Sequence, residues 1–196
     1  RNGNFMPVMA HESPCKTAQP ALSNFIRAFS SLTERGCDVL CIVLSSALSG
    51  TYSSACFAAD QVGGNIRVVD SETIGAGMHL LVDEAVNMVK CGLSFEEVVK
   101  HVEGIKKKIG IAFTVESPDR LIAGGRLNNP KAKTTLNLRP VFSLKGKICF
   151  RENARGSRER LEALLSAVPE NARRLIVCRC GEGTYVSEFT RLLHGR

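Results

Sequence analysis

Two apolar segments separated by a helix-length stretch place the strongest constraint on how this chain folds. Residues 38–44 predict a buried strand, residues 51–62 a helix, and residues 66–69 a second strand after a glycine pair. Strands joined by a helix of this length predict a parallel pair with a right-handed crossover. Ligands bind beyond the carboxyl ends of the strands in such sheets, so the loops after these two strands are the first candidates for a site.

The loop after the first strand is rich in hydroxyl groups. Residues 45–51 read Ser-Ser-Ala-Leu-Ser-Gly-Thr and lie directly before the predicted helix. A helix start offers free N–H groups and a favourable dipole, and hydroxyls add neutral donors. The pattern predicts a site for a carboxylate or a phosphate. The alternative is ordinary helix capping by Ser49.

The rest of the chain alternates between helical and extended patterns. Apolar residues from Leu22 to Leu32 recur at helical spacing, and helices follow at 78–90 and from Ser94, which opens a capping box, to about residue 108. Beyond that point we expect strand 110–115, hairpin 139–150, helix 157–167, strand 174–179 and helix 183–193. The prediction is an α/β protein with two domains. Residues 1–108 form a domain with a parallel sheet and flanking helices, and residues 109–196 a second α/β domain with a mixed sheet and a β-hairpin.

Charge is unevenly distributed along the chain. The formal net charge is +7, and residues 91–196 carry 20 basic and 11 acidic groups. Nucleic acid is one acidic partner for such a surface, but Trp is absent, aromatic residues make up 6%, and no recognition motif accompanies the charge. A solvated basic face is the simpler interpretation, and a protein partner comes next.

The cysteines do not predict a metal centre. The eight cysteines include no Cys-x-x-Cys pair and no Cys/His zinc spacing. Cys41 and Cys178 fall within predicted strands, where we expect free thiols that act as small hydrophobes in a reducing cytoplasm. No apolar run approaches the roughly 20 residues that span a bilayer, so we expect no integral membrane association.

Three further motifs could contribute to a site. Thr17 lies just before a helix start, which by itself suggests an N-terminal cap. Val69-Asp-Ser71 follows the second strand. Gly124-Gly-Arg126 combines close backbone approach with a cation that has several fixed donors.

In this order and spacing, the motifs resemble those of the DegV-like family of bacterial acyl-chain-binding proteins. The matching segments are Lys16-Thr-Ala-Gln-Pro20, Leu44–Tyr52, Val69-Asp-Ser71, Gly124-Gly-Arg126, and Leu136-Asn-Leu-Arg-Pro140 with Lys145-Gly146. The resemblance implies a two-domain α/β fold that binds a long-chain fatty acid in a buried interdomain tunnel. It also implies a cytoplasmic protein without catalytic residues, metal or cofactor. Some members present the acyl carboxylate to a separate kinase subunit, which phosphorylates it.

The resemblance also implies roles for individual residues. Thr17 and Ser49 match the carboxylate-binding hydroxyls, Gly50 and Thr51 belong to the same turn, and Arg126 matches the arginine of the Gly-Gly-Arg loop. The family's kinase-facing basic patch corresponds to the region of Arg155 and Arg158, which we expect to face a partner.

Some family features have no counterpart in this sequence. Ala18 stands where the family commonly has Ser, and nothing matches the family's N-terminal strand or its C-terminal His-x-Gly-Pro-Gly segment. We therefore expect terminal segments to be missing here. Two rival hypotheses remain: a serine hydrolase that uses Ser49 or Ser46, and a basic nucleic-acid-binding protein. The first lacks a Gly-x-Ser-x-Gly elbow.

Overall fold

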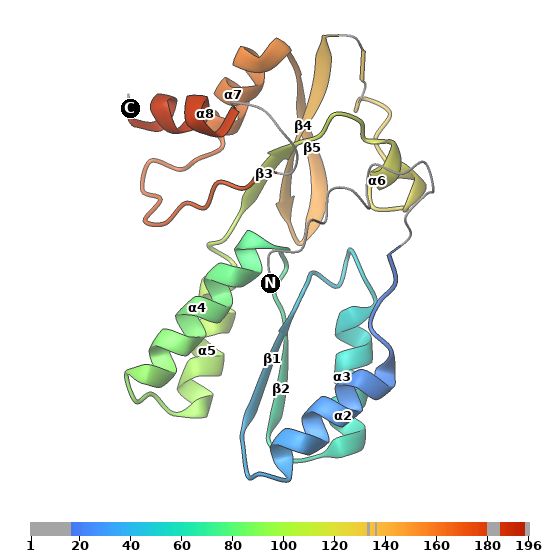
Figure 1. The fold of residues 1–196 in the computed structure, drawn as a ribbon, viewed down its shortest axis with the longest axis vertical. Coiled ribbons are helices and arrows are strands. Elements are labelled where there is room, and N and C mark those ends of the chain that lie inside the picture. The colour runs from blue at the N-terminus through green and yellow to red at the C-terminus, as the bar shows by residue number, and fades with distance from the viewer. Residues whose placement is uncertain (1–16, 133, 136, 180–184, 195–196) are drawn as a thin grey trace.

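The computed structural model describes residues 17–132, 134–135, 137–179 and 185–194. Lys16, Leu136 and residues 183–184, which enter the predictions above, lie outside the described residues. Figure 1 shows two layered parts, one built around a parallel sheet and the other around an antiparallel sheet. Across the described part of the chain, no helix has the length and apolar character needed to cross a bilayer.

The first part contains the predicted parallel strand pair. The strands β1 (Val39–Val43) and β2 (Ile66–Asp70) pair in parallel, with Val39 opposite Ile66 and Val43 opposite Asp70. Helix α3 (Thr51–Val62) connects them over the range that the sequence predicts. The other helices of this part are α2 (Leu22–Thr33), α4 (Ala76–Lys90) and α5 (Phe95–Lys106).

Alternate residues of the two strands face two separate cores. Cys41 and Val68 pack with Phe29 of α2 and Ala58 of α3, whereas Val69 packs with residues of α4 and α5. Figure 1 shows these helix pairs on opposite sides of the sheet. Because successive side chains of a strand point to opposite faces, each strand contributes to both cores. Burial raises the pKa of the Cys41 thiol, as expected for a thiol that packs as a small hydrophobe.

The second part is a three-stranded antiparallel sheet in the order β3-β4-β5. The hairpin prediction is confirmed, and its strands are longer than predicted. A short helix that the sequence analysis did not predict, α6, follows β3. The elements are β3 (Ile111–Thr114), α6 (Asp119–Ala123), β4 (Leu138–Lys145), β5 (Lys147–Arg155), α7 (Gly156–Ser166) and α8 (Tyr185–His194).

The antiparallel sheet also separates two cores. Phe142 is fully buried and lies among aromatic side chains, with ring centroids 5.3 Å from Phe113 and 6.2 Å from Phe150. Its neighbour Val141 points to the other face, where it packs with Ala163 of α7. A register shift between Val141 and Phe142 interrupts the ladder with β5. Both pairings among the described strands of this sheet are antiparallel, whereas the sequence predicted a mixed sheet.

The predicted strand at 174–179 is wrong. These residues have no strand structure, and Leu175, Ile176 and Val177 are exposed. Arg174 instead forms an ion pair with Asp83 of α4, with 2.6 Å between Nη2 and Oδ2. A β-forming composition specifies a strand only where a neighbouring strand accepts its hydrogen bonds. The expectation that Cys178 is a buried strand residue fails with it, since Cys178 is exposed. The division at residues 108 and 109 stays a prediction.

Candidate functional site

The loop between β1 and α3 starts from a fully buried serine. Ser45 is inaccessible to solvent, and its N–H donates to the carbonyl oxygen of Thr73 at 2.9 Å. The Ser45 carbonyl accepts the N–H of Leu48 at 3.0 Å, which closes a turn. The next serine, Ser46, is exposed, and its N–H donates to the carboxylate of Asp70 at 3.2 Å. The loop thus leaves the sheet in a defined direction.

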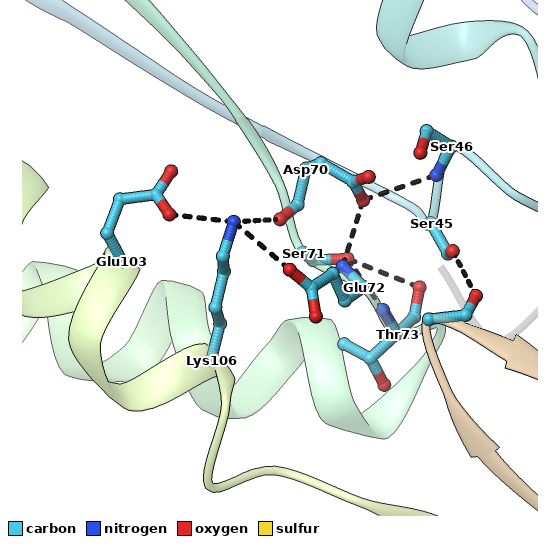
Figure 2. Close-up of polar contacts among 9 residues, drawn as sticks. Ser45, Ser46, Asp70, Ser71, Glu72, Thr73, Glu103 and Lys106 are labelled. Atoms are coloured by element: carbon cyan, nitrogen blue, oxygen red, sulfur yellow. Dashed lines mark hydrogen bonds and ion pairs between the residues drawn. The ribbon is translucent and has the colours of Figure 1, made fainter.

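The loop after β2 folds against it through short-range polar contacts. The Asp70 carboxylate also accepts the N–H of Glu72 at 2.9 Å, and the Ser71 hydroxyl donates to the Thr73 carbonyl at 3.2 Å (Figure 2). Glu72 adopts φ 54°, a left-handed conformation that costs a non-glycine residue roughly 1–2 kcal/mol. The Thr73 hydroxyl is buried and has no hydrogen-bond partner among the residues that the structure describes. The carboxyl ends of both strands therefore meet in one polar, tightly built region.

A lysine side chain at the end of α5, only 11% exposed, pairs with carboxylates of this region. Lys106 Nζ lies 2.7 Å from Glu103, 3.5 Å from Glu72 and 3.1 Å from the Asp70 carbonyl oxygen (Figure 2). Burial by itself lowers the pKa of Lys106, but the hydrogen bond and charge of Glu103 and the charge of Glu72 outweigh it. The net result is a raised pKa, so Lys106 is charged at neutral pH.

Ser49 and Thr51, two of the expected carboxylate-binding residues, form a hydroxyl pair. Their oxygens lie 2.8 Å apart, and the Ser49 hydroxyl also accepts the N–H of Thr51 at 3.3 Å. The capping alternative therefore describes part of what Ser49 does. Helix α3 nevertheless begins at Thr51, and its N-cap residue, Gly50, provides no side-chain cap. Neither partner of Ser49 is a base, so these contacts do not activate it as a nucleophile.

Arg126 approaches the same loop from the antiparallel part. Its Nε donates to the carbonyl oxygen of Leu48 at 3.3 Å, across 78 residues of sequence. The Arg126 side chain is exposed, and a Cβ at Gly124 would press against it. The glycine thus allows the guanidinium to lie close to the backbone. The structure thus places Arg126 against the carbonyl group of Leu48, the residue before Ser49.

The segment around Thr17 reaches the loop through its neighbour Gln19. Gln19 Nε2 donates to the Ser54 hydroxyl at 3.1 Å, and a Cβ at Gly50 would overlap the Gln19 amide oxygen. Thr17 itself is exposed, and the N-terminus of α2, at Ala21, has no side-chain cap. The N-cap interpretation of Thr17 is therefore wrong. Gln19, which belongs to the matched segment but was not expected to bind the carboxylate, makes the contact.

Two surface hollows occur in the antiparallel part. One, of about 410 Å³, is lined by Gly125–Asn129 and Lys147–Phe150 and so adjoins Arg126. The other, of about 350 Å³, lies between β5 and α7, and three carboxylates line it: Glu152, Glu159 and Glu162. The carboxylates make the second hollow unsuitable for an anion. Only the first is close to the loop at 45–51.

The two arginines expected to face a partner, Arg155 and Arg158, lie near the end of the hairpin that is opposite its turn. Arg155 ends β5 and is exposed, and its N–H donates to Glu159 at 2.7 Å. Arg158 forms an exposed ion pair with Glu162 at 2.9 Å. They are close in sequence and accessible, but they are not part of the polar region at the strand ends.

Several cations of the basic half are paired within the molecule. The Glu116 carboxylate lies 2.8 Å from Arg160 and 2.7 Å from Arg139. The hydrogen bond from Arg160, and to a smaller extent that from Arg139, holds the pKa of Glu116 below its usual range. These pairs reduce the positive charge available to a nucleic acid. Within the described ranges, no group of three or more His, Cys, Asp or Glu side chains is arranged to hold a metal ion.

Comparison with known proteins explains why these motifs converge. The family model described as "Uncharacterised protein, DegV family" matches residues 2–193. The chain belongs to the DegV family. A DegV domain-containing protein of Staphylococcus aureus (strain COL) is 31% identical over 169 residues, which are 85% of this chain and 61% of the relative. The chain thus spans about three fifths of the length of the curated relatives it matches.

Solved structures of DegV proteins share the fold. A DegV lipid-binding protein from Thermotoga maritima has a TM-score of 0.78 and 28% identity, with 96% of this chain and 69% of that chain covered. The fatty acid kinase B3 protein of Streptococcus pneumoniae, loaded with linoleic acid, has a TM-score of 0.68 and 28% identity, with 80% and 57% covered. The α/β fold with separate parallel and antiparallel sheets is therefore that of DegV proteins, which are bacterial and include fatty-acid-binding members.

Proposed function

We propose that this DegV protein binds a long-chain fatty acid and holds its carboxylate in the region of Thr17, Ser49 and Arg126. The observation that carries the proposal is the hydrogen bond from Arg126 to the Leu48 carbonyl, next to the Ser49 and Thr51 hydroxyls. A buried carboxylate is costly unless it accepts hydrogen bonds. Hydroxyls and a guanidinium are suitable donors. Gly50 leaves room for the amide of Gln19, and Thr17 lies two residues before Gln19.

The acyl chain supplies most of the affinity in this proposal. Transfer of a chain of about 16 carbons out of water gains roughly 0.8 kcal/mol for each buried methylene group. The head group then fixes the orientation. We propose that the chain occupies a tunnel between the parallel and antiparallel parts. The apolar residues of α4 are not all available as a lining, since Leu81 and Ala85 are core residues and Val82 and Val86 are exposed.

The test of binding is native mass spectrometry followed by organic extraction. Purified protein should carry a fatty acid or take up added acyl chains, without any metal or cofactor. The double variant Thr17→Ala/Ser49→Ala should weaken acyl binding more than it lowers the melting temperature. Ser53→Ala, which removes an exposed hydroxyl from α3, is the matched control. Protein that is empty and fails to bind added acyl chains would refute the proposal.

We further propose that this protein works in the cytoplasm and presents the acyl carboxylate to a separate kinase subunit. The fatty acid kinase B3 protein among the similar structures supports this proposal. Arg155 and Arg158 are exposed and form the partner-facing surface. The variant Arg155→Ala/Arg158→Ala should lower phosphorylation of the bound acyl chain by a bacterial fatty acid kinase and leave acyl affinity unchanged. Arg191→Ala on α8 is the control. An equal loss of phosphorylation in the control and in the double variant would exclude this surface.

The hydrolase alternative predicts a different result. A fluorophosphonate probe would label Ser49 or Ser46 if either were a nucleophile. We expect no adduct at either position, because the Ser49 hydroxyl is hydrogen-bonded to a threonine hydroxyl and an amide and not to a base.

A further inference from the structure

The turn of the β4–β5 hairpin crosses from the antiparallel part to the strand ends of the parallel part. Gly146 donates its N–H to the Glu72 carbonyl oxygen at 2.7 Å, and its own carbonyl oxygen accepts the Ser45 hydroxyl. Gly146 adopts φ 73°, a conformation that favours glycine. Both backbone polar groups of Gly146 are therefore satisfied by residues 74 and 101 positions away. We call this contact of Ser45, Glu72 and Gly146 the hairpin clip.

The side that receives the turn is fixed by contacts of its own. Ser45 is fully buried and bonded through its N–H to Thr73, and the Asp70 carboxylate holds the N–H groups of Ser46 and Glu72. Figure 2 shows the two bonds of the Asp70 carboxylate at the ends of β1 and β2. The acceptor and donor of the hairpin clip are thus held in place independently of the hairpin.

Lys106 secures the strained member of the clip. Its side chain is 11% exposed, and its ammonium group contacts the carboxylate of Glu72 and the carbonyl oxygen of Asp70 on either side of Ser71. Glu103 completes the pairing at 2.7 Å. The left-handed conformation of Glu72, which turns its carbonyl group toward Gly146, is therefore held by an ion pair at its side chain.

The clip and the candidate ligand site share one loop. Ser45 begins the loop and bonds to Gly146, while Leu48 lies in its middle and bonds to Arg126. Two points of the same short loop are thereby tied to two different elements of the antiparallel part. Hydrogen bonds require donor–acceptor distances of about 2.7–3.2 Å and weaken steeply at angles below about 120°, so a small change in this docking would misalign the donors.

We propose that Ser45, Glu72 and Lys106 are positioning residues that set the spacing between Ser49 and Arg126 and so control how long the acyl ligand stays bound. This inference rests on the proposed fatty-acid-binding function. It assigns a role to residues that do not themselves touch the carboxylate. Opening the clip releases the hairpin turn and, with it, the alignment of the two sides of the site.

The experiment compares Ser45→Ala with Ser46→Ala in the whole chain. Ser46 is the adjacent serine, and only its backbone N–H takes part in the contacts above, so it is the matched control. Hydrogen exchange of the Gly146 amide, followed by NMR, reports the clip without any ligand. Release of cis-parinaric acid, a fluorescent long-chain fatty acid, reports the site. For Ser45→Ala we expect both rates to rise about tenfold, since a net hydrogen bond is lost, and for Ser46→Ala neither to change.

Each other outcome overturns the inference. Faster exchange with unchanged release would make the clip a purely structural contact, and unchanged exchange would mean that Ser45 does not hold the turn. If wild-type protein takes up no cis-parinaric acid while the Gly146 amide stays protected, the proposed function itself has failed.

A second pair of variants covers the case in which Ser45→Ala does not fold. Lys106→Gln removes the ion pair with Glu72, and Lys107→Gln removes an exposed neighbouring charge as the control. Lys106→Gln should accelerate release, and Lys106→Arg should restore slow release. Slow release in Lys106→Gln would contradict the positioning role.

Discussion

The two parts of the molecule contribute to the candidate site in opposite ways. The parallel part supplies a loop with the Ser49 and Thr51 hydroxyls, and almost inaccessible residues anchor it, with Ser45 and Ser71 0% and Thr73 2% exposed. The antiparallel part supplies an exposed cation, Arg126, held by one hydrogen bond of 3.3 Å. The hydroxyl side is built before any ligand arrives, whereas the position of the cation depends on how the hairpin and its neighbouring loop dock.

The cores of the two parts also differ. The parallel part is packed mainly with aliphatic side chains around Val69 and Leu81, and the antiparallel part has an aromatic cluster around Phe142. Among the described residues, the contacts between the two parts include the hairpin clip, the Arg126–Leu48 hydrogen bond and the Arg174–Asp83 ion pair. Selective damage to each part should therefore show how strongly one depends on the other.

The largest effect is expected from emptying one core at a time. Phe142→Ala should cost about 3–5 kcal/mol and Leu81→Ala about 2–5 kcal/mol, because both side chains are fully buried. If the division near residue 108 is a domain boundary, calorimetry should show that each variant lowers a different transition. Phe57→Ala, at an exposed position of α3, should stay within about 0.5 kcal/mol. A single transition that both variants lower equally would join the two parts into one unit.

A smaller effect tests how tightly the parallel part is built. A Cβ at Gly77 would overlap the buried Thr73 hydroxyl and lie 2.9 Å from Thr73 Cγ2, so Gly77→Ala should destabilise by about 1–3 kcal/mol. Gly104→Ala in α5 is the matched control, because nothing lies within 4 Å of its added Cβ. That variant should stabilise by roughly 0.5–1 kcal/mol through helix propensity. Melting temperatures measure both, and a neutral Gly77→Ala would mean that the loop around Thr73 yields easily.

Arg126 tests the exposed side of the site. Arg126→Gln should weaken fatty acid binding by about tenfold or more, since a charged hydrogen bond is lost. It should leave the melting temperature nearly unchanged because the side chain is exposed. Titration calorimetry with a soluble long-chain fatty acid measures the first effect, and Arg120→Gln on α6 controls for loss of charge. Loss of stability without loss of affinity would make Arg126 a structural contact only.

The smallest effect concerns acid stability of the antiparallel part. Arg160 and Arg139 lower the pKa of Glu116 in the folded protein, so its contribution is present above the unfolded pKa of about 4.3 and is lost as pH falls through the folded value. The Glu116 side chain is 72% exposed, which limits the contribution to less than about 1 kcal/mol. Urea unfolding should show wild type more stable than Glu116→Gln at pH 7, with the difference disappearing toward pH 3. A constant difference would exclude the ion pairs as its source.

Local signals determined much of the fold. Helix α3 occupies its predicted range because Gly50 and the glycine pair after Val62 mark both ends, and the capping box at Ser94 sets the start of α5, where Glu97 accepts the Ser94 N–H at 2.8 Å. The parallel pairing of β1 and β2 follows from the helix between them. These features depend on neighbours within a few residues, which a sequence displays directly.

The tertiary structure alone decided the features that depend on distant partners. The hairpin clip joins Ser45 to Gly146 across 101 residues, and Lys106 meets Glu72 only because α5 packs beside the end of β2. The segment 174–179 has the composition of a strand, yet it remains unpaired because a strand also requires a neighbour in space. The sequence by itself determined most of the elements and the motifs that mark the candidate site. Their juxtaposition, and the polar contacts that fix it, depended on packing between parts of the chain that no local pattern records.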